Sequence, residues 1–150
     1  IVVNVDGDDA LLTNEALKII KKHFDEGADV SVGNCFNVLK PTRIYDHVDF
    51  IKPWLRAGDN IWLHPKCFLL KLAKQIKQSD LMNNQHHYYE YDTDFAIMYA
   101  ILRNASHPVF IKDLIYLYDR AIYSGKTIQL INKIRNELAI KARQDYLTKE

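Results

Sequence analysis

The sequence predicts an α/β fold in which one sheet is covered by helices on both faces. Three observations lead to this class. An apolar run at residues 1–3 precedes a segment with helical spacing, and residues 29–38 then alternate between apolar and polar side chains. Chains that alternate between strand and helix in this way place their strands in one sheet. With 150 residues, of which 48% are hydrophobic, the chain is long enough for one compact domain with its own core.

The beginning of the chain predicts a strand and then a helix. Ile1–Val3 are β-branched and stand together, which is typical of a buried strand. Thr13 or Asn14 is expected to cap the helix and Gly27 to end it. The apolar stripe of this helix consists of Ala16, Leu17, Ile20 and Phe24. A second strand follows at residues 29–38.

The middle of the chain is less regular. Residues 40–60 contain two prolines and a glycine and are expected to form an extended excursion over the surface. Pro65 suits the first turn of a second helix. The residues that this helix would bury are Phe68, Leu69, Leu72 and Ile76. Residues 79–90, SDLMNNQHHYYE, lack a period and predict a loop.

The last third predicts a helix, a β-rich stretch and a final helix. The first helix, from about Asp92 to Asn104, is apolar nearly all round and is expected to be deeply buried. Pro108 opens the β-rich stretch, which ends at Tyr118. The final helix covers about residues 127–147 and is basic on its outer side. That basic side is either a solvated face or a contact with an anionic membrane.

Composition limits the classes of function. The formal net charge is +1, so no global field indicates a nucleic-acid partner. The two cysteines, Cys35 and Cys67, are not in metal-binding spacing and indicate reduced thiols of a cytoplasmic protein. No apolar run approaches the roughly 20 residues that span a bilayer. We expect a soluble protein, or one attached at most to the inner face of the membrane.

The most informative stretch is VDGDDALL, in which three carboxylates follow the first strand. Ligands of open α/β sheets bind outside the carboxyl ends of the strands, which is where Asp6, Asp8 and Asp9 stand. Carboxylate oxygens suit Mg²⁺ or Mn²⁺, and Gly7 lets the backbone turn tightly beside a ligand. The stretch therefore predicts a site for a divalent cation.

Two other interpretations of this stretch stay open. In the first it is a calcium loop, with Asn4, Asp6, Asp8 and Glu15 at the first, third, fifth and twelfth positions. That pattern is incomplete, because Asp9 replaces the required glycine and a strand leads into the loop. In the second it is an ordinary acidic turn, in which Asp9 helps to start the next helix.

Four segments taken in order resemble the GT-A glycosyltransferases, most closely glycosyltransferase family 2. They are VDGDDALLTNEAL, NIWLHPKCFLLKL, YDTDFAIMYAILRNA and VFIKDLIYLYDR. The resemblance covers roughly residues 1–120 and leaves residues 121–150 as a C-terminal helix. It implies a mixed sheet flanked by helices, within a single partial domain at residues 1–150. The strands that bind the nucleotide base in this family precede the Asp-x-Asp strand, so we expect the N-terminal nucleotide-binding portion to be missing.

The resemblance also implies roles for the acidic turn. The Asp-x-Asp of the family holds the divalent ion that binds the nucleotide-sugar diphosphate. By this resemblance Asp8 is a ligand of Mn²⁺ or Mg²⁺, and Asp6 is a second metal ligand or a contact to the nucleotide. Asp9 lies on the same nucleotide-sugar side. Trp62 and His64 are further candidates there, although His64 equally suits the cap of a following helix.

An acid at the start of a helix beneath the acceptor is the catalytic base of inverting members. YDTDF matches that place, and Asp94 is the residue carried over. The family usually has Glu-Asp here, whereas this chain has Thr93-Asp94, so Asp92 is a competing candidate. Asp92 is also well placed as the helix cap, which would occupy its oxygen.

These residues together imply a metal-dependent, inverting glycosyltransferase. It would move a sugar from a nucleotide-diphosphate donor to a glycan or lipid-linked acceptor, with peripheral contact to a membrane in the second case. The alternative is a non-catalytic carbohydrate-binding or assembly module that keeps the fold without turnover. Asp6, Asp8 and Asp94 together favour the enzyme, because a binding module has no need of a base.

Overall fold

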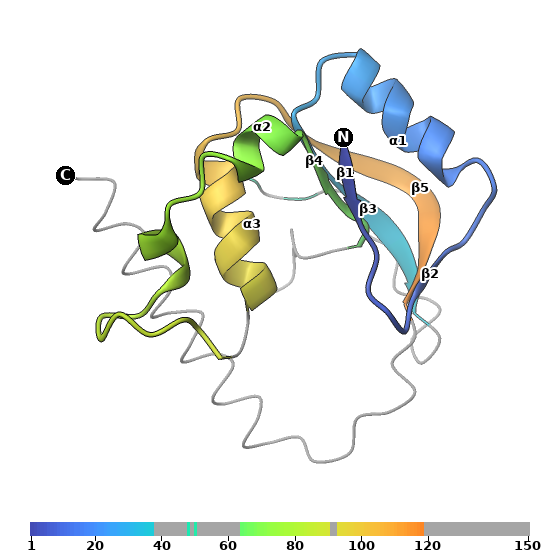
Figure 1. Cartoon of the computed structure of the whole chain (residues 1–150). Coiled ribbons are helices and arrows are strands. Elements are labelled where there is room, and N and C mark those ends of the chain that lie inside the picture. Colours follow the sequence, from blue (N-terminus) through green and yellow to red (C-terminus); the bar gives the residue numbers. More distant parts are fainter. Residues whose placement is uncertain (38–47, 49, 51–63, 91–92, 119–150) are drawn as a thin grey trace. The chain divides into compact units, whose positions relative to one another are not determined.

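The computed structural model describes residues 1–37, 48, 50, 64–90 and 93–118 (Figure 1). It confirms the mixed α/β class, with helices and a curled five-stranded sheet. The chain divides into two compact units, Ile1–Leu70 with Ala105–Ile122, and Lys71–Asn104 with Tyr123–Glu150. All five strands belong to the first unit. Within the described part of the chain, none of the helices has the length and apolar character needed to cross a membrane.

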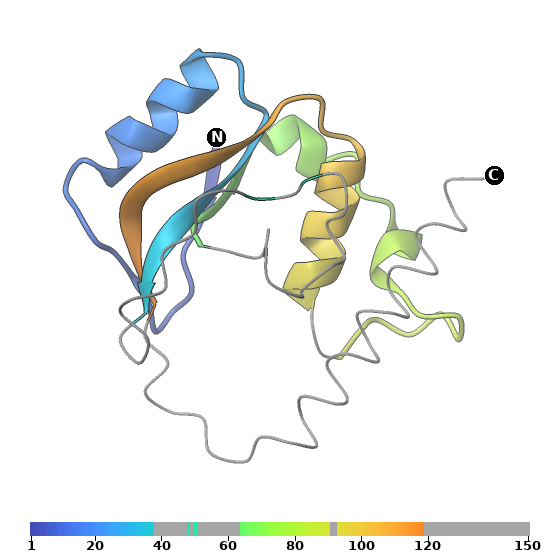
Figure 2. The same cartoon turned by 180° about the vertical axis from the view of Figure 1, so that it is seen from behind.

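The sheet is mixed and has the strand order β1-β4-β3-β5-β2. Its strands are β1 (Val2–Asn4), β2 (Ala10–Leu11), β3 (Val30–Asn37), β4 (Lys66–Phe68) and β5 (Pro108–Tyr118). Strand β4 lies antiparallel between β1 and β3, and β3 pairs with β5 in parallel. Figure 2 shows β3 and β5 side by side. The short strand β2 closes the other edge, antiparallel to β5.

The parallel pair contains an irregularity that matters for the site. Gly33 pairs with Ile111, but Asn34 pairs with Leu114 and Cys35 with Tyr116, so β5 carries extra residues. The Asn34 side chain donates to the carbonyl oxygen of Lys112 at 3.0 Å. This bond satisfies a backbone acceptor in the part of β5 where the regular strand pairing is interrupted. The shifted register sets where the tyrosines of β5 stand at the end of the strand.

Helix α1 (Ala16–Asp25) packs on the sheet as predicted, with one exception. Ala16 and Ile20 are fully buried against Cys67, Ile111 and Ile115, and Phe24 packs against this cluster while only half-buried. Leu17 was expected in the stripe but is 55% exposed, because it lies about 100° round the helix from Ala16.

The ends of α1 are set by the backbone more than by a side-chain cap. The N-cap is Glu15, without a side-chain hydrogen bond, so the prediction of Thr13 or Asn14 as the cap is wrong by one or two residues. The Thr13 hydroxyl instead accepts from the N–H of Glu15. Gly27 ends the helix with φ at +108°, as predicted.

The predicted helix from Pro65 is wrong at its beginning. Pro65 follows a cis peptide bond and leads into β4, and only Leu70–Ala73 form a helix, α2. Lys66–Phe68 are buried and hydrogen-bonded to strands on both sides, which outweighs their helical spacing. Pro65 fits there because β3 has no side chain at Gly33, where a Cβ would lie 2.9 Å from Pro65 Cδ.

The second unit contains the 3₁₀ turn η1 (Gln78–Leu81) and helix α3 (Thr93–Arg103). Helix α3 confirms the prediction of a deeply buried helix, with Phe95, Ala96, Met98, Tyr99, Ala100 and Ile101 buried. Asp80 is 1% exposed and accepts from Arg103 at 3.0 Å, which ties η1 to α3. The predicted last helix at residues 127–147, and almost all of residues 40–60, lie outside the described residues.

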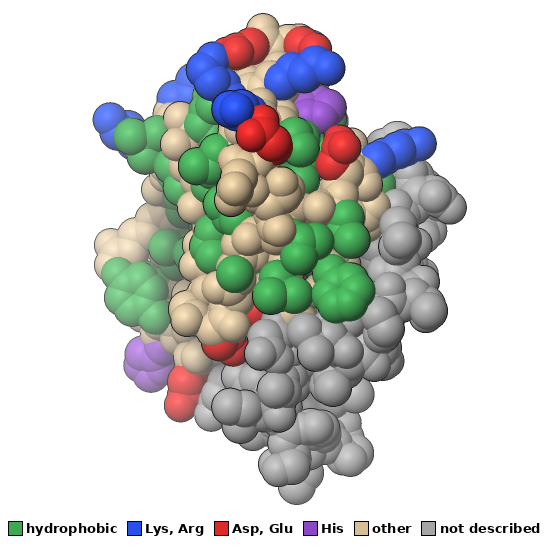
Figure 3. Space-filling model, turned by 90° about the vertical axis from the view of Figure 1, so that its right-hand side faces the viewer, with side chains coloured by type: hydrophobic (Ala, Val, Ile, Leu, Met, Phe, Trp, Pro, Cys, Tyr) green, Lys and Arg blue, Asp and Glu red, His purple; other side chains and the backbone are tan. Residues whose placement is uncertain are grey.

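Several large apolar side chains of the first unit are exposed: Ile1, Val5, Leu12, Leu17 and Leu70. Figure 3 shows hydrophobic side chains among charged ones on one face of the molecule. Strand β1 is also the edge of the sheet, with Val2 and Val3 half-buried. Among the described strands, β1 pairs with β4 alone, so the apolar run at residues 1–3 lies at an edge of the sheet.

Candidate metal centre

The acidic stretch after β1 folds into a tight turn. The N–H of Asp9 donates to the carbonyl oxygen of Asp6 at 3.1 Å. Asp6 and Asp9 are half-buried, whereas Gly7 and Asp8 are exposed. A Cβ on Gly7 would meet no atom within 4 Å, and the glycine has no positive φ, so this turn does not require glycine at that position.

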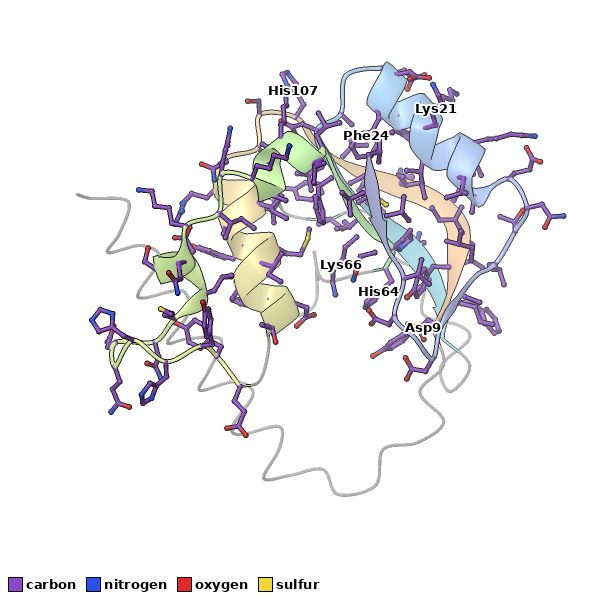
Figure 4. The ribbon with its side chains drawn as sticks, in the orientation of Figure 1. Asp9, Lys21, Phe24, His64, Lys66 and His107 are labelled. Carbon is purple, nitrogen blue, oxygen red and sulfur yellow. The ribbon has the colours of Figure 1, made fainter. Side chains whose placement is uncertain are left out.

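His64 lies beside this turn because of the strand register. Asn4 of β1 pairs with Lys66 of β4 in the antiparallel ladder, so the residue two positions after Asn4 comes close to the residue two positions before Lys66. Those residues are Asp6 and His64. Oδ2 of Asp6 is 3.8 Å from Nε2 of His64, and Figure 4 labels Asp9, His64 and Lys66 at this end of the sheet.

Asp6, Asp9 and His64 form a group that can hold a metal ion. One ligand atom from each residue lies within 4.8 Å of the other two. The 3.8 Å between Asp6 and His64 is less than twice a metal–ligand bond of about 2.1 Å, so one ion can bind both atoms. Two carboxylate oxygens and one imidazole nitrogen are ordinary ligands for a divalent cation. The donor set therefore fits Mn²⁺ well, and fits Mg²⁺ through its two oxygens.

His64 is held by aromatic rings. It is 8% exposed and stacks on Tyr116, with ring centroids 5.0 Å apart and 24° between the planes. It also stacks on Tyr118 at 5.3 Å and 13°. Both tyrosines come from the end of β5, where alternate residues of a strand share a face. Stacking of this kind limits rotation of the imidazole and so orients its nitrogen atoms.

Tyr116 also connects the two acids. Its Oη accepts from the N–H of Asp6 at 3.0 Å and donates to Oδ2 of Asp9 at 2.8 Å. Burial is the main reason why the pKa of the Tyr116 phenol is raised. The hydrogen bond from Asp6 opposes this shift, and the carboxylates of Asp9 and Asp6 add to it. The phenol therefore keeps its proton and remains a donor to Asp9 at neutral pH.

Lys66 brings a positive charge close to the group. Its side chain is 2% exposed overall, and Nζ lies 3.5 Å from Nε2 of His64. An ammonium group only donates, so a hydrogen bond between them uses the lone pair of Nε2. The same lone pair is what a metal ion would take. Nε2 thus lies close to both a cationic donor and the anionic oxygen of Asp6.

The structure brings together some of the predicted site residues. Asp6, Asp9 and His64 meet in one group, whereas Asp8 of the same turn is exposed and outside it. Asp94 is exposed in the first turn of α3, in the second unit. Trp62 and Asp92 lie outside the described residues. The prediction that His64 caps a helix is wrong, because β4 follows it.

Three residues of this region were not predicted from the sequence: Lys66, Tyr116 and Tyr118. The only signal for the tyrosines was their alternate spacing in IYLYDR, which places two phenols on one face of a strand. The signal for Lys66 was its position two residues after His64. Neither spacing shows which loop faces those side chains, because that depends on strand order and register.

Comparison of the chain with family models, with curated proteins and with solved structures finds no match in any of the three. The case for a function rests on the site and on the sequence patterns that led to it.

Proposed function

We propose that this chain takes part in glycosyl transfer from a nucleotide-diphosphate sugar to a saccharide or lipid-linked acceptor, with inversion at the anomeric carbon. The observation that carries the proposal is the group of Asp6, Asp9 and His64 at the carboxyl end of β1, with ligand atoms within 4.8 Å of one another. The ends of strands are where α/β proteins bind phosphate-bearing ligands. The resemblance to glycosyltransferase family 2 supplies the reaction class.

In this proposal the residues of the turn bind the diphosphate end of the donor. Asp6, Asp9 and His64 would hold Mn²⁺ or Mg²⁺, which supplies Lewis-acid stabilisation of the negative charge on the departing diphosphate. Tyr116 keeps the carboxylate of Asp9 in place through its phenolic proton. Asp8, exposed on the same turn, remains available to the nucleotide side of the donor.

Asp94 is the proposed general base. Its carboxylate takes the proton of an acceptor hydroxyl while that oxygen forms a bond to the anomeric carbon. The bond from the same carbon to the diphosphate oxygen breaks, and its electron pair leaves with the nucleoside diphosphate. The sugar passes through an oxocarbenium-like transition state, as in glycoside hydrolysis. Asp94 ends the step protonated and returns its proton to water.

The proposal is tested by the melting temperature of the full chain with Mn²⁺ alone, a nucleoside diphosphate alone, and both together. We expect Mn²⁺ to raise the melting temperature and the diphosphate to raise it further only when Mn²⁺ is present. A ligand at about 100 times its dissociation constant stabilises by roughly 2.7 kcal/mol. A carbohydrate-binding module would instead be stabilised by oligosaccharides without metal or nucleotide, and that result would contradict the proposal.

A further inference from the structure

One buried side chain contacts all three members of the candidate metal group. Tyr116 is 0% exposed. Its Oη accepts from the backbone N–H of Asp6 at 3.0 Å and donates to Oδ2 of Asp9 at 2.8 Å. Its ring stacks on His64 with the centroids 5.0 Å apart. Tyr116 comes from β5, a strand that supplies none of the three ligand atoms.

We propose that Tyr116 is the positioning residue of the metal centre: it aligns the Asp9 carboxylate, the backbone at Asp6 and the His64 ring, so that their ligand atoms converge before a cation binds. This inference rests on the metal site of the proposed function. It adds a residue that touches neither metal nor substrate and acts through the ligands alone.

The hydrogen-bond chemistry fixes the direction of both contacts. A backbone N–H can only donate, so the phenolic oxygen must accept from Asp6. A phenol has one proton, and that proton is left for Asp9. This hydrogen bond occupies one of the roughly four lone-pair sites of the Asp9 carboxylate. Hydrogen bonds of this kind to metal-binding carboxylates are the usual way in which ligands are oriented.

The variant that isolates this role is Tyr116→Phe. It keeps the buried ring and the stacking on His64 but loses both hydrogen bonds. The Asp9 carboxylate then loses a hydrogen bond that orients it for a cation. Loss of a hydrogen bond that orients a metal ligand typically weakens metal binding by about 10- to 100-fold. Tyr118→Phe is the matched control, because Tyr118 also stacks on His64 from the same strand.

The experiment measures the Mn²⁺ dissociation constant of the full chain by the EPR signal of free Mn²⁺, well below the melting temperature. We expect Tyr116→Phe to bind roughly 10- to 100-fold more weakly than wild type, and Tyr118→Phe to bind as wild type does. In an Asp9→Asn background, where the carboxylate is gone, Tyr116→Phe should have much less further effect. Such non-additivity marks a residue that acts through its neighbour.

The outcomes separate this inference from the function on which it rests. If wild type binds Mn²⁺ and Tyr116→Phe binds equally well, Tyr116 does not position the ligands, while the metal site stands. If Tyr116→Phe lowers the Mn²⁺ affinity by the same factor in the wild-type and Asp9→Asn backgrounds, Tyr116 has a general structural role. That result also overturns the inference. If the wild-type chain binds no Mn²⁺, the metal site fails and the positioning role fails with it.

Discussion

Nε2 of His64 lies 3.8 Å from Oδ2 of Asp6, across the end of the antiparallel pair β1–β4. This contact joins a nitrogen ligand to the acidic turn. Carboxylate oxygens suit both Mg²⁺ and Mn²⁺. An imidazole nitrogen is a better ligand for a transition-metal ion such as Mn²⁺ than for Mg²⁺. The His64–Asp6 contact therefore bears on which ion the site prefers.

The first prediction is that Mn²⁺ binds more tightly than Mg²⁺, by on the order of tenfold or more, because of this nitrogen ligand. In His64→Gln the Mn²⁺ affinity should fall, while the weaker Mg²⁺ affinity should change little. The ratio of the Mn²⁺ affinity to the Mg²⁺ affinity should therefore move toward one. Calorimetric titration of each ion into both proteins measures the two ratios. A ratio that is the same in wild type and His64→Gln would show that His64 is not a ligand.

The second prediction concerns the packing that places His64. A Cβ at position 33 would lie 2.9 Å from Pro65 Cδ and 3.3 Å from Ile115 Cδ1. Gly33→Ala should therefore push the His64–Pro65 segment away from β3 and lower the free energy of unfolding by about 1–3 kcal/mol. Because His64 moves with Pro65, Mn²⁺ affinity should fall as well. Urea unfolding and Mn²⁺ titration check the two effects.

Gly7→Ala is the control for this substitution. No atom lies within 4 Å of a Cβ at position 7. Its stability should equal that of wild type or exceed it by up to about 1 kcal/mol, since alanine restricts the unfolded chain. If Gly33→Ala is as stable as Gly7→Ala, the close approach of Pro65 to β3 does not limit the fold.

Much of the fold was predictable because its signals are local. The alternation at residues 29–38 corresponds to β3, the apolar helix at residues 92–104 to α3, and the stretch from Pro108 to Tyr118 to β5. Strand β4 was not predictable in this way. Phe68, Leu69, Leu72 and Ile76 have helical spacing, and only pairing with β1 and β3 makes Lys66–Phe68 a strand.

The site was predictable in its chemistry and less so in its membership. Residue type and position after a strand pointed to Asp6, Asp8 and Asp9 without separating them. The family resemblance favoured Asp8 as the metal ligand, whereas the structure groups Asp9 with Asp6 and His64. The difference arises because the bond from Asp9 N–H to Asp6 O and the contact with Tyr116 set the side-chain directions within the turn. Tyr116 itself reaches the turn only because β5 carries extra residues opposite Asn34.

The third prediction is a loss of stability at high pH. Burial raises the pKa of the Cys67 thiol from 9.0 to about 12, against a smaller lowering effect of the neighbouring Ser31 side chain. Below about pH 9 the thiol is protonated in both states, so its contribution is fully present. Between pH 9 and 12 only the unfolded chain releases the proton, so the contribution is lost by up to about 1.4 kcal/mol per pH unit.

Urea unfolding of wild type and Cys67→Ala at about pH 8 and pH 10.5 measures this effect. Cys67→Ala should be less stable at pH 8, because a buried side chain is shortened, but should lose less stability between the two pH values. The pKa of Tyr116 is also raised, so both proteins should keep part of the slope above pH 10. Equal slopes in the two proteins would show that Cys67 does not contribute.

The fourth prediction concerns the base. Asp94 is exposed at the start of α3, and Asp94→Asn keeps its shape while removing the proton acceptor. In an assay of sugar transfer, the rate should fall by about 10² to 10⁴. Mn²⁺ and nucleoside diphosphate affinities should stay the same, because the residues of the acidic turn are intact. If Asp92→Asn is the slower of the two variants, the base has been assigned to the wrong acid.

The central claim is that a divalent cation is bound by Asp6, Asp9 and His64, and two neighbouring acids test it most directly. Asp8 and Asp9 are adjacent in the same turn, but only Asp9 belongs to the group with Asp6 and His64. The measurement is the Mn²⁺ dissociation constant of wild type, Asp8→Asn and Asp9→Asn. Asp9→Asn loses one ligand and should weaken Mn²⁺ binding at least tenfold, which corresponds to about 1.4 kcal/mol. Asp8→Asn should bind Mn²⁺ nearly as wild type does. Absence of Mn²⁺ binding by wild type, or a loss confined to Asp8→Asn, would contradict the claim.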